Sequence, residues 1–159
     1  MRIEEVHGEA EKQKIARRIL EELPEWFGIP EAREAYIRNC TDKLFFAAFD
    51  NELPVGFLYL KETGRDTAEL YVMGVRKAYH RKGIGRALFE AAKRTANAKG
   101  YSFLQVKTVK MGCYQQYDDT NRFYQSLGFK EFEMIPDLWS ENNPCQIYVM
   151  YIGNNQQNG

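Results

Sequence analysis

The residues best suited to chemistry lie in one continuous stretch. A run rich in Leu, Tyr and Val (69–75) leads into a basic turn (80–82) and a Gly-Ile-Gly segment (83–85). Residues 86–99 then carry apolar side chains at helical spacing, and Gly100 is a stop signal. The first N–H groups of a helix have no internal partner and carry the positive end of its dipole. Glycines let an anion approach the backbone, so this stretch is predicted to bind phosphate.

Two common phosphate-binding loops do not fit these residues. A P-loop needs Gly-Lys-Ser/Thr, but Gly85 is followed by Arg86 and Ala87, which leaves no hydroxyl for magnesium. A dinucleotide fingerprint needs a third glycine three residues later, and Leu88 occupies that position. A kinase-like nucleotide-binding domain is therefore a poor interpretation.

The stretch resembles the pyrophosphate loop of the GCN5-related N-acetyltransferase (GNAT) superfamily, Gln/Arg-x-x-Gly-x-Gly/Ala, which binds acetyl-coenzyme A. His80 stands where Gln or Arg is usual, a mild departure because that loop contacts phosphate mainly through backbone N–H groups. Gly-x-Gly alone would equally mark a tight turn. However, residues 121–129, NRFYQSLGF, resemble the GNAT Asn…Phe/Leu-Tyr-x-x-x-Gly-Phe helix end. Two motifs in order make the match specific over roughly residues 40–135.

The resemblance implies acetyl-CoA as cosubstrate and a set of contacts to it. In this fold the strand at 102–109 splays from the central strand, and the pantetheine satisfies unpaired backbone groups like an added strand. The loop backbone and its basic side chains would hold the phosphates. The implied cofactor-binding residues are Met73, Val75, His80, Arg81, Lys82, Gly83, Ile84, Gly85, Arg86, Ala87 and Asn121. Asn121 is equally well explained as a residue of the first turn of its helix, and His80 as a surface contact.

Acetyl transfer to an amine involves two proton transfers. An ammonium with a pKa of ~10.4 costs about 4–5 kcal/mol to neutralise at pH 7 without help, and a carboxylate can take its proton. A tyrosine hydroxyl can protonate the departing thiolate. By resemblance, Tyr124 is the candidate acid and Glu69 the candidate base. The alternatives are a core tyrosine beside Phe123 and a solvated glutamate at a strand start, since many GNAT enzymes have no single base.

Four aromatic residues are candidates for binding the acceptor. Trp26 and Phe27 lie in a predicted loop at 25–30, between the first two helices, and this connection often walls the acceptor site in the family. Capping the core explains them equally well. Tyr114 and Tyr117 lie in a predicted loop at 110–117, near the expected mouth of the acceptor site.

Composition narrows the class of protein. The chain has 159 residues, 44% of them apolar and 14% aromatic, which suits one domain with a proper core. Lys+Arg and Asp+Glu both number 22, so nucleic acid is not expected as a partner. No apolar run approaches the length of a membrane span, and the N-terminus lacks a signal-peptide core. Cys40, Cys113 and Cys145 form no C-x-x-C pair, which predicts reduced thiols, no metal and a cytoplasmic protein.

The order of elements predicts an α/β chain of the α+β type. Strands are expected at 2–6, 44–49, 55–61, 69–75, 102–109, 129–135 and 146–152, and helices at 9–23, 31–40, 86–99 and 119–128. Asp118 or Asp119 is expected to cap the last helix, and 136–144 to form a loop that carries Trp139. The resemblance implies one GNAT domain over residues 1–153, with a central mixed, mostly antiparallel sheet, splayed strands and flanking helices. Residues 154–159 are expected to be a polar, frayed tail.

The leading hypothesis is an N-acetyltransferase in which a primary amine of a small molecule or peptide attacks acetyl-CoA directly. The neutral net charge does not single out aminoglycosides, polyamines or protein N-termini. The alternative is a module of the same fold that binds acyl-CoA without turnover, as a sensor or regulatory subunit. Tyr124 and the intact loop favour turnover. The acceptor and the pathway are left open, and a homodimer is compatible with the sequence.

Overall fold

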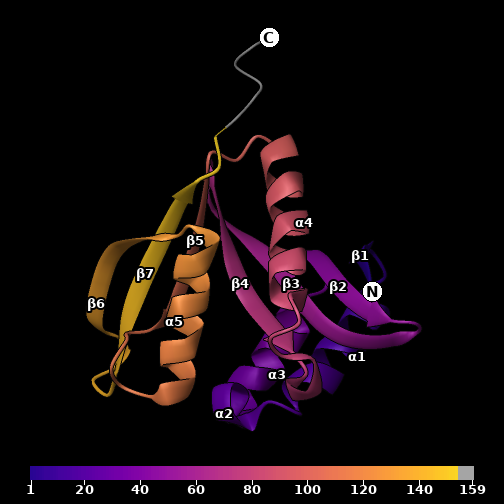
Figure 1. The fold of residues 1–159 in the computed structure, drawn as a ribbon, viewed down its shortest axis with the longest axis horizontal. Coiled ribbons are helices and arrows are strands. Elements are labelled where there is room, and N and C mark those ends of the chain that lie inside the picture. The colour runs from indigo at the N-terminus through magenta and orange to yellow at the C-terminus, as the bar shows by residue number, and fades with distance from the viewer. Residues whose placement is uncertain (154–159) are drawn as a thin grey trace. The chain divides into compact units, whose positions relative to one another are not determined.

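The computed structural model describes residues 1–153, and the expected tail at 154–159 lies outside them. The elements in order are β1 (Arg2–Val6), α1 (Glu9–Leu20), α2 (Pro24–Phe27), α3 (Pro30–Asn39), β2 (Leu44–Asp50), β3 (Leu53–Gly64), β4 (Thr67–Val75), a 3₁₀ turn (Lys77–Tyr79), α4 (Ile84–Ala98), β5 (Phe103–Val109), α5 (Gln115–Leu127), β6 (Lys130–Ser140) and β7 (Asn143–Tyr151) (Figure 1). The described chain is therefore of the α+β class, as the sequence predicts.

Within residues 1–153 the strands form one mixed sheet of seven in the order β1-β2-β3-β4-β5-β7-β6. The pairs β1–β2, β2–β3, β5–β7 and β6–β7 are antiparallel. Strands β4 and β5 are parallel, with Thr67 opposite Phe103 and Glu69 opposite Gln105. A parallel pair needs a long crossover, and α4 provides it. The predicted mixed, mostly antiparallel sheet is confirmed, while the predicted splay of strands stays a prediction.

The chain divides into two compact units. The first contains residues 1–61 and 71–96, and the second contains 62–70 and the residues from 97 onward. Strand β4 is shared: its first residues belong to the second unit and its last residues, from Tyr71, to the first.

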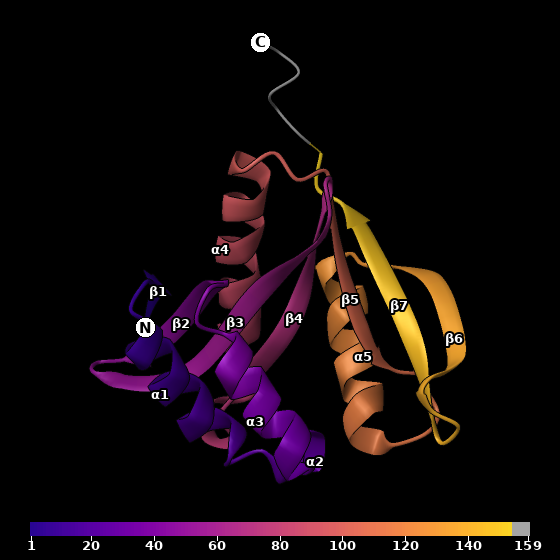
Figure 2. The same cartoon turned by 180° about the vertical axis from the view of Figure 1, so that it is seen from behind.

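In the first unit, helices cover both faces of the sheet. Helices α1 and α3 lie on one face of β2 and β3, and α4 lies on the other (Figure 2). Between the α1 face and the strands is a stack of aromatic rings, in which the Phe45 and Phe57 centroids are 5.3 Å apart and those of Phe57 and Tyr59 are 6.4 Å apart. Gly74 lets α1 approach closely, because an added Cβ would lie 3.1 Å from a methyl of Ile19. Aromatic burial of this extent contributes much of the stability of the unit.

In the second unit, α5 packs beside β5 and β7 (Figure 2). Leu104 and Val106 of β5 and Tyr148 of β7 are almost fully buried. Helix α5 ends at Gly128, whose φ of 107° is the left-handed conformation that glycine adopts readily. The N–H of Phe129 donates to the carbonyl of Tyr124, 3.2 Å away, so this helix end holds Tyr124 close to the following strand.

Several predicted boundaries were wrong at helix ends. Helix α1 stops at Leu20, and Pro24 opens the short helix α2 inside the predicted loop at 25–30. Proline suits the first turn of a helix, where an N–H would lack a partner. Helix α5 starts at Gln115 with Tyr114 as N-cap, so neither Asp118 nor Asp119 caps it. Instead, Asp118 Oδ1 accepts a hydrogen bond from the N–H of Gly112 at 2.7 Å.

The predicted loop at 136–144 was also wrong. Strand β6 continues to Ser140 and β7 begins at Asn143, so the two strands form a hairpin. The pairing register shifts between Ile135 and Ser140, and Pro136 lies within that irregular stretch. Prolines are tolerated at such bulges because no ladder N–H is needed there. Trp139 lies on β6 and is about half exposed.

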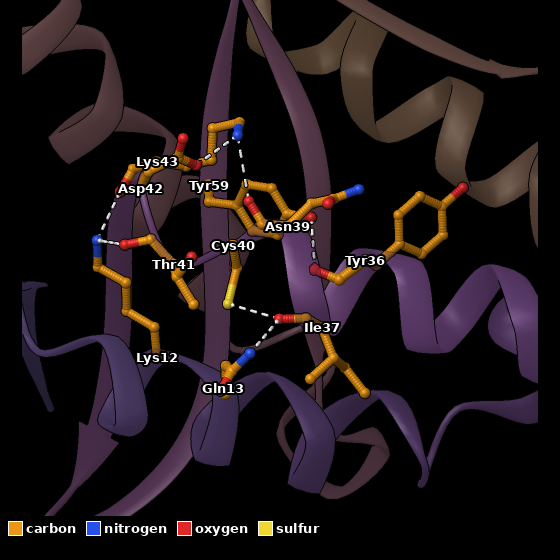
Figure 3. Close-up of polar contacts among 10 residues, drawn as sticks. All are labelled: Lys12, Gln13, Tyr36, Ile37, Asn39, Cys40, Thr41, Asp42, Lys43 and Tyr59. Atoms are coloured by element: carbon orange, nitrogen blue, oxygen red, sulfur yellow. Dashed lines mark hydrogen bonds and ion pairs between the residues drawn. The ribbon is translucent and has the colours of Figure 1, made fainter.

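A buried lysine ties α1 to the end of α3 (Figure 3). Lys12 Nζ donates to the carbonyls of Thr41, at 2.9 Å, and Lys43, at 2.8 Å. Lys12 is only 6% exposed, and burying its side chain would be costly if the two carbonyl groups did not accept its hydrogen bonds. Nearby, the amide of Gln13 and the thiol of Cys40 both donate to the carbonyl of Ile37, at 3.4 Å and 3.2 Å. The last carbonyl groups of a helix lack helical partners, and side chains supply them here.

We expect Lys12→Met to lower the free energy of unfolding by about 2–3 kcal/mol, because hydrogen bonds from a charged group contribute about 1.5–3 kcal/mol. Methionine keeps the unbranched stem and removes only the ammonium. The matched control is Lys14→Met on the same helix, where the lysine is exposed. Urea unfolding measures both variants. Equal stability of the two would show that the Lys12 bonds contribute nothing net.

Candidate functional site

The predicted phosphate loop lies in the first unit, where β4 ends and α4 begins. Two of its residues have left-handed backbones: Gly83, with φ of 80°, and Arg81, with φ of 62°. The first helical bond of α4 runs from the N–H of Ala87 to the carbonyl of Gly83, at 3.0 Å. The N–H groups at the start of α4 therefore precede the helical ladder and carry the positive end of its dipole. The glycine turn and the helix start lie where the sequence predicts them, and phosphate binding by this loop stays a prediction.

The side chains of this loop are exposed and basic. Arg81, Lys82 and Arg86 are all exposed, and residues 76–89 contain no Asp or Glu. Ile84, by contrast, is 3% exposed and faces the core, so only its backbone is available to a ligand. The side chain of Ile84, between Gly83 and Gly85, thus anchors the loop to the core.

His80 is held inside the loop. Its Nε2 lies 2.7 Å from the carbonyl oxygen of Val75, and because a carbonyl only accepts, the ring nitrogen donates. The imidazole also meets the Trp26 ring edge-on, with centroids 6.0 Å apart. The side chain therefore links the loop to the end of β4 and to α2. Contact of His80 with phosphate stays a prediction, as do the backbone contacts of Met73 and Val75, which are half-buried.

Two ion pairs fasten the start of the loop to the helical layer. Arg76 Nε donates to Glu22 Oε1 at 2.9 Å, and Lys77 donates to Glu25 of α2. The hydrogen bond from Lys77 holds the pKa of the Glu25 carboxyl below its usual value. These two contacts tie the start of the loop to the helices of the first unit.

The predicted acceptor residues of α2 are part of a longer row of rings. Trp26 and Phe27 are half-buried and pack against the core, as one of the two interpretations held. The Phe27 ring meets Tyr36 edge-on at 6.0 Å, and Tyr36 meets Tyr71 in the same way at 5.8 Å. The ammonium of Lys61 lies 4.8 Å from the centroid of the Tyr71 ring. The sequence places Tyr71 in the predicted central strand, but nothing in the local pattern indicates that it joins this row of rings.

The other two predicted acceptor residues lie in the second unit. Tyr114 is exposed, Tyr117 is half-buried, and their rings meet at 6.1 Å. Tyr117 is in the first turn of α5 instead of the predicted loop. Contact of any of these four aromatic residues with an acceptor stays a prediction.

Glu69, the candidate base, is buried and paired. It is 4% exposed, and Lys107 Nζ donates to its Oε1 at 2.7 Å. The interpretation of Glu69 as a solvated strand-end residue is therefore wrong. Parallel pairing places Glu69 opposite Gln105, and Lys107 comes two residues later on the same face of β5. The alternation of polar residues on this strand was visible in the sequence, but the partnership needed the β4–β5 register.

Tyr124, the candidate acid, lies in the same unit. Its ring packs against Phe123, Phe129 and Tyr148, with centroids 5.7, 6.0 and 6.4 Å away. Burial, with a smaller contribution from the negative charge of Glu69, raises the pKa of Tyr124 above its ordinary value. Among the described residues no hydrogen-bond partner is recorded for its hydroxyl. The group is therefore protonated at neutral pH and its proton is uncommitted.

The pKa of the Cys145 thiol is influenced by the charges of Glu69 and Lys107. Burial raises the pKa of Cys145 to about 11, with Lys107 opposing the rise and Glu69 adding to it. Three buried residues, Glu69, Tyr124 and Cys145, thus form one cluster with the half-buried Lys107, and β4, α5, β7 and β5 contribute them. At neutral pH the thiol and the phenol are both uncharged.

Asn121 is committed to internal hydrogen bonds. It is fully buried, and its Nδ2 donates to the carbonyls of Val109, at 2.8 Å, and Tyr117, at 2.7 Å. Its Oδ1 accepts from the Tyr148 hydroxyl at 2.6 Å, and that hydroxyl accepts from Gln125 at 3.2 Å. Asn121 is also in the middle of α5, so the first-turn interpretation is wrong. Both hydrogens of Nδ2 are used in these bonds, so the acceptor Oδ1, which has a second lone pair, is the atom left for a contact with pantetheine.

We expect Asn121→Ala to cost more than about 2 kcal/mol of unfolding free energy, because several buried groups would lose their partner at about 1–3 kcal/mol each. Tyr148→Phe, which removes a single hydroxyl, should cost less. Thermal unfolding and calorimetric titration with coenzyme A measure the two effects separately. A stable Asn121→Ala protein that loses coenzyme A affinity would instead identify Asn121 as a cofactor contact.

Comparison with known proteins identifies the family. Residues 41–131, more than half of the chain, match the family model described as the acetyltransferase (GNAT) domain. The chain therefore belongs to the GNAT family of acetyltransferases. A search of curated protein sequences finds no match.

Solved structures share the fold along almost the whole chain. A protein from Desulfovibrio desulfuricans assigned to the GNAT family superposes with a TM-score of 0.82 at 17% identity, covering 96% of this chain and 99% of that one. An aminoglycoside 6'-N-acetyltransferase complexed with coenzyme A gives 0.74 at 17%, covering 96% and 97%. IAA acetyltransferase from Bacillus cereus gives 0.73 at 22%, covering 94% and 98%. At these identities the likeness shows the fold.

Two kinds of feature are absent from the residues that the structure describes. Across residues 1–153 no group of three or more His, Cys, Asp or Glu side chains is arranged to hold a metal ion. Within the same residues, no helix combines the length and apolar character that crossing a bilayer requires.

Proposed function

We propose that this protein is an acetyl-CoA-dependent N-acetyltransferase that acts on a primary amine of a small molecule or peptide by direct attack. Membership of the GNAT family supports acetyl transfer in general. The observation that carries the proposal is the cluster in which the protonated hydroxyl of Tyr124 lies near the carboxylate of Glu69, which is paired with Lys107. General acid and general base catalysis need those two groups in those two protonation states.

The loop at 81–87 is proposed to hold the pyrophosphate of acetyl-CoA. Backbone N–H groups at the start of α4 donate to phosphate oxygens, and Arg81, Lys82 and Arg86 add positive charge. Exposure of these three side chains suits a flexible, polar ligand. The structural neighbour that was solved with coenzyme A supports the choice of cofactor.

Glu69 and Tyr124 are proposed to carry out the proton transfers. The amine nitrogen forms a bond to the thioester carbonyl carbon, the carbon–sulfur bond breaks, and Glu69 takes the amine proton. Because Oε1 of Glu69 accepts from Lys107, the other carboxylate oxygen is the one we assign to the proton. Tyr124 donates its proton to the departing sulfur and regains one from solvent. General acid or base help of this kind contributes about 10²–10⁴ in rate.

One observation favours the alternative of an acyl-CoA-binding module without turnover. A carboxylate already paired with Lys107 is a less ready base than a free one, since its negative charge is partly compensated. Release of thiol from acetyl-CoA across a panel of amines separates the two functions, because a sensor would bind the cofactor and release none. A cytoplasmic location, absence of nucleic acid and membrane partners, and a homodimer stay predictions.

We expect Gly83→Asp to abolish or strongly weaken coenzyme A binding without unfolding the protein. The residue is exposed and no atom lies within 4 Å of an added Cβ, so the fold has room for a side chain. The matched control is Gly83→Asn, which has the same shape without the charge and tolerates the left-handed backbone. Calorimetric titration should show that coenzyme A and desulfo-coenzyme A both bind to the wild-type protein, because the loop is proposed to contact the phosphates and not the sulfur. Equal affinities of the Asp and Asn variants would exclude phosphate binding at Gly83.

Removing the Tyr124 hydroxyl should slow the chemical step. We expect Tyr124→Phe to lower kcat by about 10–10³-fold, because the ring contacts remain and only the acid is lost. Coenzyme A affinity and thermal stability should stay near wild type. Tyr101→Phe removes another hydroxyl, one bonded to Glu62, and serves as control. Normal turnover by Tyr124→Phe would make Tyr124 a core residue only.

The raised pKa of Tyr124 has a consequence for the pH profile. Because burial favours the protonated phenol, the wild-type rate should not fall through ionisation of Tyr124 below about pH 10. A loss of kcat in the range of about pH 8–9 that disappears in Tyr124→Phe would contradict this.

A further inference from the structure

The Glu69–Lys107 ion pair is asymmetric. The side chain of Glu69 is 6% exposed and that of Lys107 is 25% exposed, with Nζ and Oε1 2.7 Å apart. Glu69 is therefore the more buried member of the pair, and Lys107 is the member with the larger exposed fraction. Within residues 1–153 neither side chain forms an ion pair with any other residue.

The other two groups of the cluster contribute no charge. The pKa values of Tyr124 and Cys145 are both raised, so the phenol and the thiol are neutral at physiological pH. The local balance is thus one carboxylate against one ammonium. In a partly buried setting such a balance has strong effects, because charges interact more strongly there than in water.

Proton transfer would upset this balance. When Glu69 takes a proton from the amine, its charge is lost, and the ammonium of Lys107 is left without its counter-ion beside the reacting nitrogen. A negative group on the acceptor would then replace the lost charge, and a second positive group would oppose it. An interaction that strengthens as the reaction proceeds changes kcat/KM and not binding alone.

We propose that Lys107 is a specificity-determining residue that favours amine acceptors carrying an anionic group next to the reacting nitrogen and disfavours polycationic amines. This rests on the proposed acetyl transfer with Glu69 as base. The substrate class it names is that of amino acids and acidic peptides, in preference to polyamines and other polycations.

Three amines of the same size test the proposal. Each compound has a different group next to the carbon that bears the reacting amine. Alanine has a carboxylate there, alaninamide a neutral amide and 1,2-diaminopropane a second amine. The readout is kcat/KM for thiol release from acetyl-CoA by wild type, Lys107→Met and Lys107→Arg. Intrinsic amine reactivity is the same for every enzyme form, so the alanine-to-diamine ratio compared between forms reports the charge at the site.

We expect the alanine-to-diamine ratio to fall at least about tenfold in Lys107→Met and to be kept in Lys107→Arg. The interaction energy of two charges a few ångströms apart near a protein surface exceeds the free energy that corresponds to a tenfold change in rate. A ratio that is the same in Lys107→Met and wild type overturns the proposal.

A second measurement uses wild type alone, in case Lys107→Met does not fold with Glu69 left unpaired. Raising salt from ~0.05 to ~0.5 M should slow alanine and speed the diamine, since ions screen both interactions. Rates that respond identically to salt for the two amines overturn the proposal. If no amine in a wider panel releases thiol, the acetyltransferase proposal itself fails, whereas turnover without charge preference overturns the role of Lys107 only.

Discussion

The structure of the second unit depends on the cost of burying the carboxylate of Glu69. A buried charge must be paired, and Lys107 provides the partner at 2.7 Å from the neighbouring parallel strand. That pair fixes the charge seen by Tyr124 and Cys145, which both respond to Glu69. Burial is the main cause of the raised pKa values of both groups, and the charge of Glu69, whose pairing depends on the register of β4 against β5, adds to both.

The same rule organises other parts of the chain. Asn121 is fully buried and bonded to α5, β5 and β7, which fixes the helix that carries Tyr124. Lys12 is buried beneath the end of α3 and donates to two carbonyl groups. Buried polar groups are costly unless they are satisfied, so each of these residues joins elements that are distant in the sequence. The basic side chains of the loop at 81–86, by contrast, stay exposed to solvent.

The two candidate regions, the loop of the first unit and the cluster of the second, use different parts of the chain. In the loop, the left-handed backbones of Arg81 and Gly83 shape the turn, and the start of α4 supplies N–H groups. A left-handed arginine is strained, which fits a residue kept for its side chain. His80 holds the turn to Val75. In the buried cluster, side chains provide the chemistry and the strands set their spacing.

The sequence by itself determined the α+β class, the order of strands and helices, and the phosphate-type loop, because these depend on local periodicity, glycines and charge near one helix start. By resemblance it also predicted Tyr124 as acid and Glu69 as base, and both roles stay predictions. Only the tertiary structure decided that Glu69 is buried against Lys107, that Asn121 is spent on internal bonds, and that residues 136–144 belong largely to a hairpin. Those facts depend on strand register and on burial, which join residues far apart along the chain and leave no local pattern.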